Sequence, residues 1–180
     1  TDELITLLME VGDGMQQFGG PPLGIGDLSF VDGGRASPYH RSHQSGRDVD
    51  LLLYLLDGKG RPIVSNAMRP VADDGRVVDG SGVQLDVVRT WALVKQCMVA
   101  QAADVQHLFL SEPLIQLVLD HARTVGEPAA VVERARELMS QPAPHAPHND
   151  HMHLRIYCSA EDANRGCVDF GAAHRRKKLD

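Results

Sequence analysis

The chain has 180 residues, of which 43% are hydrophobic, and a formal net charge of −6. This length and composition fit one globular domain that buries a core without depending on disulfides, and no apolar run approaches the roughly 20 residues that cross a bilayer. The one dense basic run, residues 174–178, lies at the extreme C-terminus and is typical of a solvated tail, so we expect neither a transmembrane segment nor nucleic-acid binding.

Local patterns in the first quarter of the chain predict a helix followed by a long irregular segment. Apolar residues at helical spacing predict an amphipathic helix from Asp2 to Gln17. Residues 18–47 are rich in Gly, Pro and Ser, which favours loops with one short strand around residues 28–31. The chain starts at Thr1 without the basic and apolar regions of a signal peptide, so we expect no signal peptide within it.

The middle of the chain predicts a hairpin and then helices. Asp48 to Leu55 is apolar after its two acids and favours a buried strand, and residues 57–60 form a predicted turn to a returning strand over Pro62–Ser65. A polar, Gly-rich loop follows over residues 73–82. Apolar periodicity then predicts three helices, with a strand after the first: helix Leu85–Ala102, strand Val105–Leu110, helix Pro113–Val125 and helix Ala129–Met139. The Pro-rich residues 141–147 end the last helix.

Residues 148–158 alternate apolar and polar side chains, which predicts a half-buried strand. One face carries Met152, Leu154, Ile156 and Cys158, and the other carries His151, His153, Arg155 and Tyr157. Strands, then helices, then a closing strand are typical of an α+β domain. We therefore predict a small antiparallel sheet flanked by helices.

Three residues have the chemistry of a catalytic metal site on that sheet. Zinc accepts imidazole and carboxylate ligands, and a catalytic zinc uses three protein ligands and leaves the fourth position for water. If the strand that begins at Asp48 lies beside the closing strand, Asp50 projects from the same face as His153. A turn at Gly46 would let His43 fold back toward them. We predict His43, Asp50 and His153 as ligands of Zn²⁺.

Amide hydrolysis at such a site also needs a base that does not bind the metal. His151 shares a strand face with His153, His148 lies three residues before it, and the ordinary pKa of histidine is about 6.5. We predict His148 and His151 as the catalytic pair that transfers protons and stabilises the oxyanion. Asp48 is either a solvated acid at the strand end or a hydrogen-bond partner of a ligating imidazole, and both readings stay open.

The remaining histidines and the cysteines have plainer interpretations. We interpret four histidines as structural or solvent-facing: His107, His121, His145 and His174. Cys158 and Cys167 are close enough in sequence to close a small loop, although spacing alone does not decide it. Cys97 lies in an apolar helical pattern, which favours a free thiol in the core.

Two strings of sequence carry a resemblance to a known family: PYHRSHQSGRDVDL and HNDHMHLRIYC. Together they resemble the signature of the penicillin-insensitive murein endopeptidases, which share a superfamily with lysostaphin-type peptidases, D-Ala-D-Ala metallopeptidases and the hedgehog signalling domain. That branch is marked by six residues between the first ligand and the aspartate, as between His43 and Asp50, and by extra histidines, here His40 and His148. The resemblance, to which RTWALVK and VQHLFLSEPL contribute, runs from about Gly34 to about Cys158.

The resemblance implies a zinc metallopeptidase that hydrolyses the D-alanyl to meso-diaminopimelyl cross-link of peptidoglycan in the periplasm. It assigns the metal to the three predicted ligands and proton transfer to His148 and His151, and it places His40 in the active site without a role that we can assign. It also implies a disulfide between Cys158 and Cys167. The partners it implies are peptidoglycan stem peptides.

We expect a single metallopeptidase domain over residues 1–180. Within it we expect an N-terminal helix and loop at residues 1–33, a catalytic core at residues 34–158 and a C-terminal extension at residues 159–180. The sequence leaves the oligomeric state open, a homodimer included.

Three other readings stay open. A carboxypeptidase or dipeptidase that removes terminal D-alanine needs a cation to clamp a free carboxylate, and the candidates for that clamp are Arg35, Arg41, Arg47 and Arg155. A metal-containing domain without catalysis could bind wall material, as hedgehog-like relatives suggest. Adventitious nickel or copper binding by residues 145–153 is the third reading.

Overall fold

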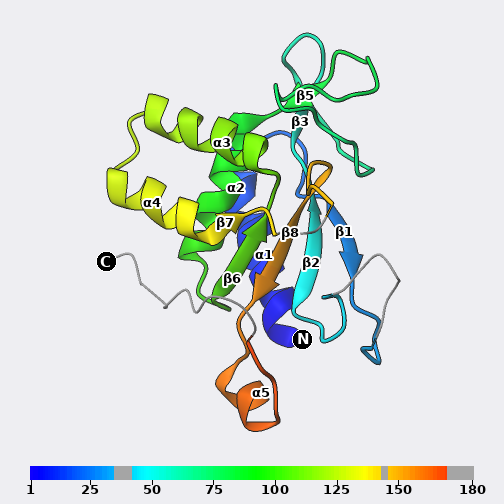
Figure 1. Ribbon diagram of the computed structural model, residues 1–180, viewed down its shortest axis with the longest axis vertical. Helices are drawn as coiled ribbons and strands as arrows, with labels where there is room; N and C mark the ends of the chain where they lie inside the picture. Colours follow the sequence, from blue (N-terminus) through cyan, green and yellow to red (C-terminus); the bar gives the residue numbers. More distant parts are fainter. Residues whose placement is uncertain (35–41, 143–145, 170–180) are drawn as a thin grey trace.

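A five-stranded sheet forms the centre of the protein, as Figure 1 shows. The structure is a computed structural model and describes residues 1–34, 42–142 and 146–169. In the described residues the strand order is β1-β2-β8-β6-β7, formed by β1 (Ile25–Leu28), β2 (Asp48–Leu52), β6 (Val105–Phe109), β7 (Met139–Ser140) and β8 (His151–Ile156). The predicted α+β fold is confirmed, with one difference in the sheet. Its pairs are antiparallel except β6 with β7, which a helical connection makes parallel.

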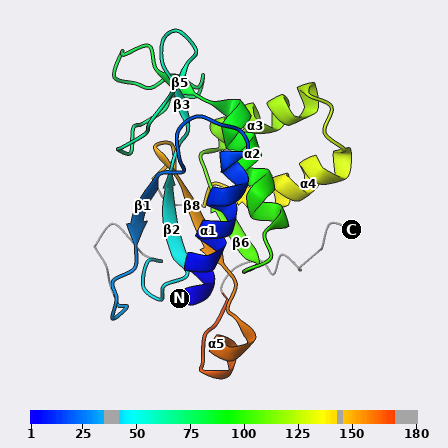
Figure 2. The same ribbon diagram turned by 180° about the vertical axis from the view of Figure 1, so that it is seen from behind.

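The helices lie mostly on one side of this sheet. They are α1 (Asp2–Gln16), α2 (Val87–Val99), α3 (Glu112–Thr124), α4 (Ala129–Leu138) and α5 (Ala160–Asn164). Figure 2 shows α1 and α2 crossing the back of the sheet, whereas the opposite face of β2 and β8 is not covered by a helix in Figure 1. The first four helices agree with the predicted ranges to within a few residues. In the described part of the chain, the helices are too short or too polar to span a bilayer.

The predicted strand over Asp48–Leu55 is wrong in its extent, because the chain changes sheet after Leu52. Leu55 and Leu56 form β3, which pairs with β4 (Pro62–Ile63) and β5 (Gln84–Leu85) in a second, antiparallel sheet. Leu53 and Tyr54 between the two strands are 2% and 4% exposed, so the apolar run continues across the change of direction. The predicted hairpin over β3 and β4 is confirmed.

The strand predicted over His148–Cys158 is confirmed in its central part as β8, whereas residues 148–150 and 157–158 lie outside the strand. Its apolar residues Met152, Leu154 and Ile156 are at most 2% exposed and belong to the same core as the buried residues of α1 and α2. Because side chains alternate along a strand, His151, His153 and Arg155 project from the other face. The core therefore fixes which face of the sheet carries the ionisable residues.

We expect Leu154→Ala to lower the free energy of unfolding by about 2–5 kcal/mol, because it leaves a cavity below the centre of the sheet. Urea denaturation measures this change. Val31→Ala is the control, since Val31 is 100% exposed and its truncation should change stability by less than about 0.5 kcal/mol. A Leu154→Ala protein as stable as the control would contradict the central position of β8.

Candidate metal centre

The pairing of β2 with β8 places their polar residues in facing positions. Asp50 lies opposite His153 and Asp48 lies opposite Arg155 in the antiparallel register. Directly opposite residues have side chains on the same face and within contact range. The four side chains therefore form two neighbouring cross-strand pairs on the face of the sheet that no helix covers.

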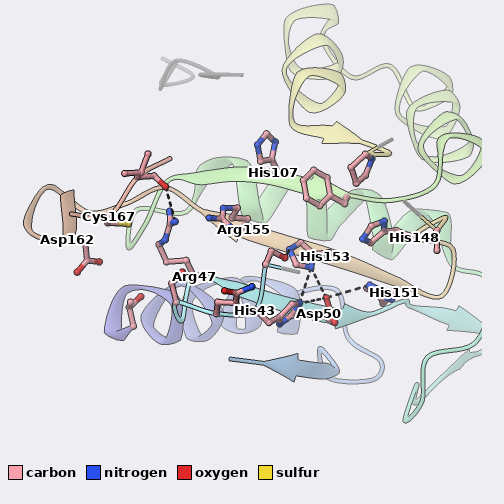
Figure 3. A pocket seen from close by; sticks show the side chains of 18 of the residues that line it. His43, Arg47, Asp50, His107, His148, His151, His153, Arg155, Asp162 and Cys167 are labelled. Atoms are coloured by element: carbon pink, nitrogen blue, oxygen red, sulfur yellow. Dashed lines mark hydrogen bonds and ion pairs between the residues drawn. The ribbon is translucent and has the colours of Figure 1, made fainter. Parts of the chain in front are cut away.

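His43 reaches this face from the segment before β2. Gly46 has a φ of 71°, in the left-handed region that glycine adopts without strain, so the bend predicted there is confirmed. The Nε2 atom of His43 lies 3.2 Å from Asp50 Oδ1 and 3.1 Å from His153 Nδ1, and the latter two atoms are 2.9 Å apart. All three residues are buried, and their ligand atoms could hold a metal ion (Figure 3).

The electrostatics of this cluster favour a cation. Burial alone would raise the pKa of the Asp50 carboxyl, but hydrogen bonds from His153 and His43 outweigh it and hold that pKa well below its usual range. Burial likewise opposes a charged His153, yet the carboxylates of Asp48 and Asp50 raise its pKa. Asp50 is therefore ionised at neutral pH, and a positive charge between these groups is stabilised.

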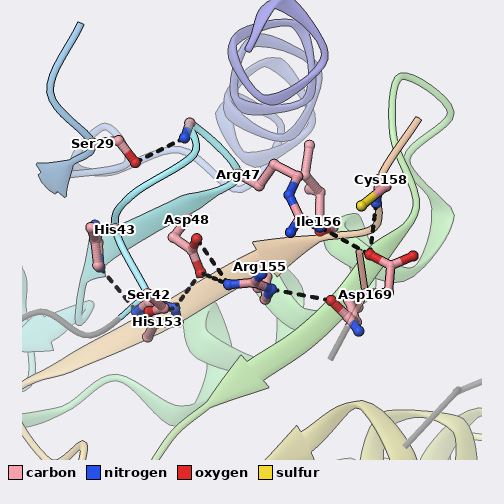
Figure 4. Close-up of polar contacts among 12 residues, drawn as sticks. Ser29, Ser42, His43, Arg47, Asp48, His153, Arg155, Ile156, Cys158 and Asp169 are labelled. Carbon is pink, nitrogen blue, oxygen red and sulfur yellow. Dashed lines mark hydrogen bonds and ion pairs between the residues drawn. The ribbon is translucent and has the colours of Figure 1, made fainter. Parts of the chain in front are cut away.

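Asp48 holds the outer nitrogen of His153, as Figure 4 shows. Its Oδ1 atom lies 3.0 Å from His153 Nε2, and the guanidinium of Arg155 donates to both carboxylate oxygens at 2.9 and 3.1 Å. Of the two readings left open for Asp48, the hydrogen-bond partner is confirmed. A carboxylate on Nε2 would keep the ring proton there when a metal ion replaces the hydrogen bond between Nδ1 and Asp50, so that the lone pair of Nδ1 becomes available to the ion.

The two histidines predicted to transfer protons lie beside the cluster. His151 Nδ1 lies 2.6 Å from Asp150 Oδ1, and its Nε2 lies 3.5 Å from Asp50 Oδ1. The ring of His148 is 5.2 Å from that of His151, centre to centre. Burial lowers the pKa of His148 to about 4, so its ring is neutral at pH 7.

Contacts with three other parts of the chain position the segment before β8. The backbone N–H of His148 donates to Gln141 Oε1 at 2.9 Å, and its carbonyl accepts from the N–H of Ser111 at 2.7 Å. The carbonyl of Asn149 accepts from Val71 N–H at 2.8 Å, and its side chain donates to the Val71 carbonyl at 3.1 Å. Because successive residues are fixed in this way, the position of His148 does not depend on β8 alone.

The cluster opens into a cavity of about 1230 Å³, one wall of which β6 provides. Phe109 stacks on His153 with ring centres 5.4 Å apart, and His107 stacks on Phe109 at 5.0 Å. His107, interpreted from the sequence as structural or solvent-facing, is 9% exposed, and it also lines this cavity. His107 and Phe109 share a strand face, but only the long-range pairing of Phe109 with His153 reveals that this face is the site.

The other sequence expectations have simple outcomes. His121, on α3, is not among the residues that line the cavity. Cys158 and Cys167 form the expected disulfide with an S–S distance of 2.10 Å, and Cys97 is a buried free thiol as predicted. Three of the singled-out histidines lie outside the described residues: His40, His145 and His174.

Comparison with known proteins agrees with this geometry. The family model described as penicillin-insensitive murein endopeptidase matches residues 1–175. Proteins of that name from Escherichia coli O157:H7 and Salmonella newport are 29% and 30% identical to the chain over 161 and 165 residues. Each match covers 88% of the chain and 54% of the relative, so the chain spans about half the length of the curated relatives it matches. The chain belongs to the penicillin-insensitive murein endopeptidase family.

Proposed function

We propose that the protein is a zinc-dependent endopeptidase that hydrolyses the D-alanyl to meso-diaminopimelyl cross-link between peptidoglycan stem peptides. The observation that carries this proposal is the convergence of three buried ligand atoms, from His43, Asp50 and His153, at one end of a long cavity. The names of the curated relatives support the substrate class. A murein substrate in turn favours the periplasm as the site of action.

Zinc suits the ligand set. The three atoms are separated by 2.9–3.2 Å, and ligands at zinc-bond length in a tetrahedron lie about 3.3 Å apart. When bound, zinc would lower the pKa of a water molecule and polarise the peptide carbonyl. His43, Asp50 and His153 would hold it, while Asp48 keeps the proton of His153 on the nitrogen that points away.

His151 and His148 would handle protons on the cavity side of this centre. Asp150 accepts a hydrogen bond from His151 Nδ1, so Nε2 carries the lone pair that can take a proton. The same Nε2 would then return the proton to the leaving amine. His148 stays neutral at pH 7 and would donate one hydrogen bond to the oxyanion, or accept one from His151 once that ring is protonated.

The carboxypeptidase alternative loses two of its candidate clamps. Arg47 is 4% exposed and donates to Asp169, Ile156 and Val168, while Arg155 is bound to Asp48. Both guanidinium groups are therefore occupied within the protein. Arg35 and Arg41 lie outside the described residues. An endopeptidase needs no such clamp next to the scissile bond, which favours our proposal.

We expect the purified protein with zinc to cleave cross-linked muropeptide dimers, and a chelator to stop the cleavage until zinc is restored. Asp50→Asn should lose both the metal and the activity, because one of three ligands is weakened. Mass spectrometry of the products and elemental analysis of the protein provide the measurements. Asp120→Asn, on the exposed side of α3, is the matched control. Dimers that remain intact with zinc present would refute the proposal.

We expect His151→Ala to reduce kcat by at least about 100-fold while the zinc content stays at the wild-type level, because His151 transfers protons and does not bind the metal. Parallel kinetics and elemental analysis separate the two effects. Unchanged kcat would exclude His151 from the chemistry, and loss of zinc would make it a ligand.

We expect Asp48→Asn to weaken zinc binding by about 10–100-fold, since the amide no longer holds the Nε2 proton of His153 as a carboxylate does. Competition with a fluorescent chelator measures the dissociation constant. Asp120→Asn again serves as the control. An unchanged dissociation constant would show that Asp48 does not orient the ligand.

A further inference from the structure

The cavity continues well beyond the candidate metal centre. Figure 3 shows His148 and His151 at one end, Arg47 and Arg155 further along, and Asp162 and Cys167 at the opposite end. The far wall is formed by the loop that the Cys158–Cys167 disulfide closes, and the loop residues that line it are Asp162, Arg165, Gly166, Cys167 and Val168. The ligands, the proton-transfer histidines and Asp48 have no part in this wall.

The disulfide loop, residues 158–169, is firmly attached to the sheet. Its two ends are joined by the disulfide and by Asp169, which accepts from the backbone N–H of Cys158 at 2.9 Å. Buried Arg47 donates to the Ile156 carbonyl before the loop, and to the Val168 carbonyl and the Asp169 carboxylate at its end. Since a buried guanidinium connects both ends, the loop is a fixed wall and Arg47 is a positioning residue for it (Figure 4).

Arg165 differs from the other arginines of the cavity wall. Arg47 and Arg155 are 4% and 12% exposed at their side chains, whereas Arg165 is 73% exposed. Its guanidinium forms an ion pair with Glu161, an equally exposed residue one helical turn earlier. An exposed ion pair of this kind contributes little stability, so a carboxylate arriving in the cavity can replace Glu161 at low cost.

We propose that the disulfide loop is a substrate-binding wall and that Arg165 on it binds a carboxylate of the peptide at a position removed from the scissile bond. The ligand class is thus an anionic peptide with at least one free carboxylate beyond the cleaved residue. This inference rests on the proposed function, because it assumes that a peptide occupies the cavity. Arg165 thus has a role in substrate binding, whereas the peptide bond is hydrolysed at the opposite end of the cavity, beside the candidate metal centre.

The test compares muropeptide dimers with free carboxylates and the same dimers with those carboxylates converted to amides. We expect Arg165→Gln to raise KM for the free dimer about tenfold with kcat little changed, and to leave KM for the amidated dimer unaltered. Glu161→Gln should lower KM for the free dimer, because it removes the competing carboxylate. Arg123→Gln, at an exposed ion pair on α3 outside the cavity, is the matched control.

Binding of fluorescently labelled dimers to the wild type and to Arg165→Gln is measured in parallel. If the wild-type protein cleaves neither dimer, the proposed function fails. The affinities of the wild type and of Arg165→Gln for the free dimer then still test whether Arg165 binds a carboxylate. If cleavage proceeds and Arg165→Gln has the KM and affinity of the wild type for the free dimer, the inference is overturned while the proposed function stands. An equal rise in KM for both dimers overturns it too, since the effect would then not depend on a carboxylate.

Discussion

The antiparallel register between β2 and β8 is the constraint on which the site depends. It places Asp50 directly opposite His153 and, two residues along each strand, Asp48 directly opposite Arg155. A slip of one residue in either strand would turn the side chains of that strand to the opposite face of the sheet and away from their partners. The buried apolar residues of the two strands, including Leu51, Met152 and Leu154, oppose such a slip, because it would move them out of the core. Hydrophobic burial on one face therefore determines the ionic arrangement on the other.

The charges buried on this face are arranged in pairs. Asp48 is 0% exposed and is bound to Arg155, and buried Arg47 is bound to Asp169. Buried ions are costly to desolvate and contribute little net stability, so we infer that these pairs serve to hold neighbouring groups in position. Asp48 fixes the orientation of the His153 ring from its outer nitrogen, and Phe109 packs on the face of the same ring. An imidazole ring that is contacted both at its edge and on its face has little freedom to turn away from the cluster.

Local periodicity was sufficient to predict the central part of β8, its two faces and the first four helices, and a glycine in the sequence predicted the bend at Gly46. Periodicity was not sufficient for the end of β2, because an apolar run has the same pattern whether it continues in one sheet or enters another. It also did not predict that β6 lies beside β8. That pairing joins residues more than forty positions apart and brings His107 and Phe109 into the site. Strand order arises from packing over the whole chain, which no short window of sequence records.

One short segment positions both ends of the cavity. Residues 42–50 contribute His43 and Asp50 to the candidate metal centre, and between these two residues they contribute Arg47, which holds both ends of the disulfide loop. The distance from the metal centre to the far wall is thus set by a few residues of β2 and the bend before it. A peptide that contacts both ends would be placed with a defined bond over the cluster. If a peptide binds as proposed, the choice of bond would depend on backbone geometry as much as on the side chains that contact the peptide, because residues 42–50 position both the candidate ligands and the wall.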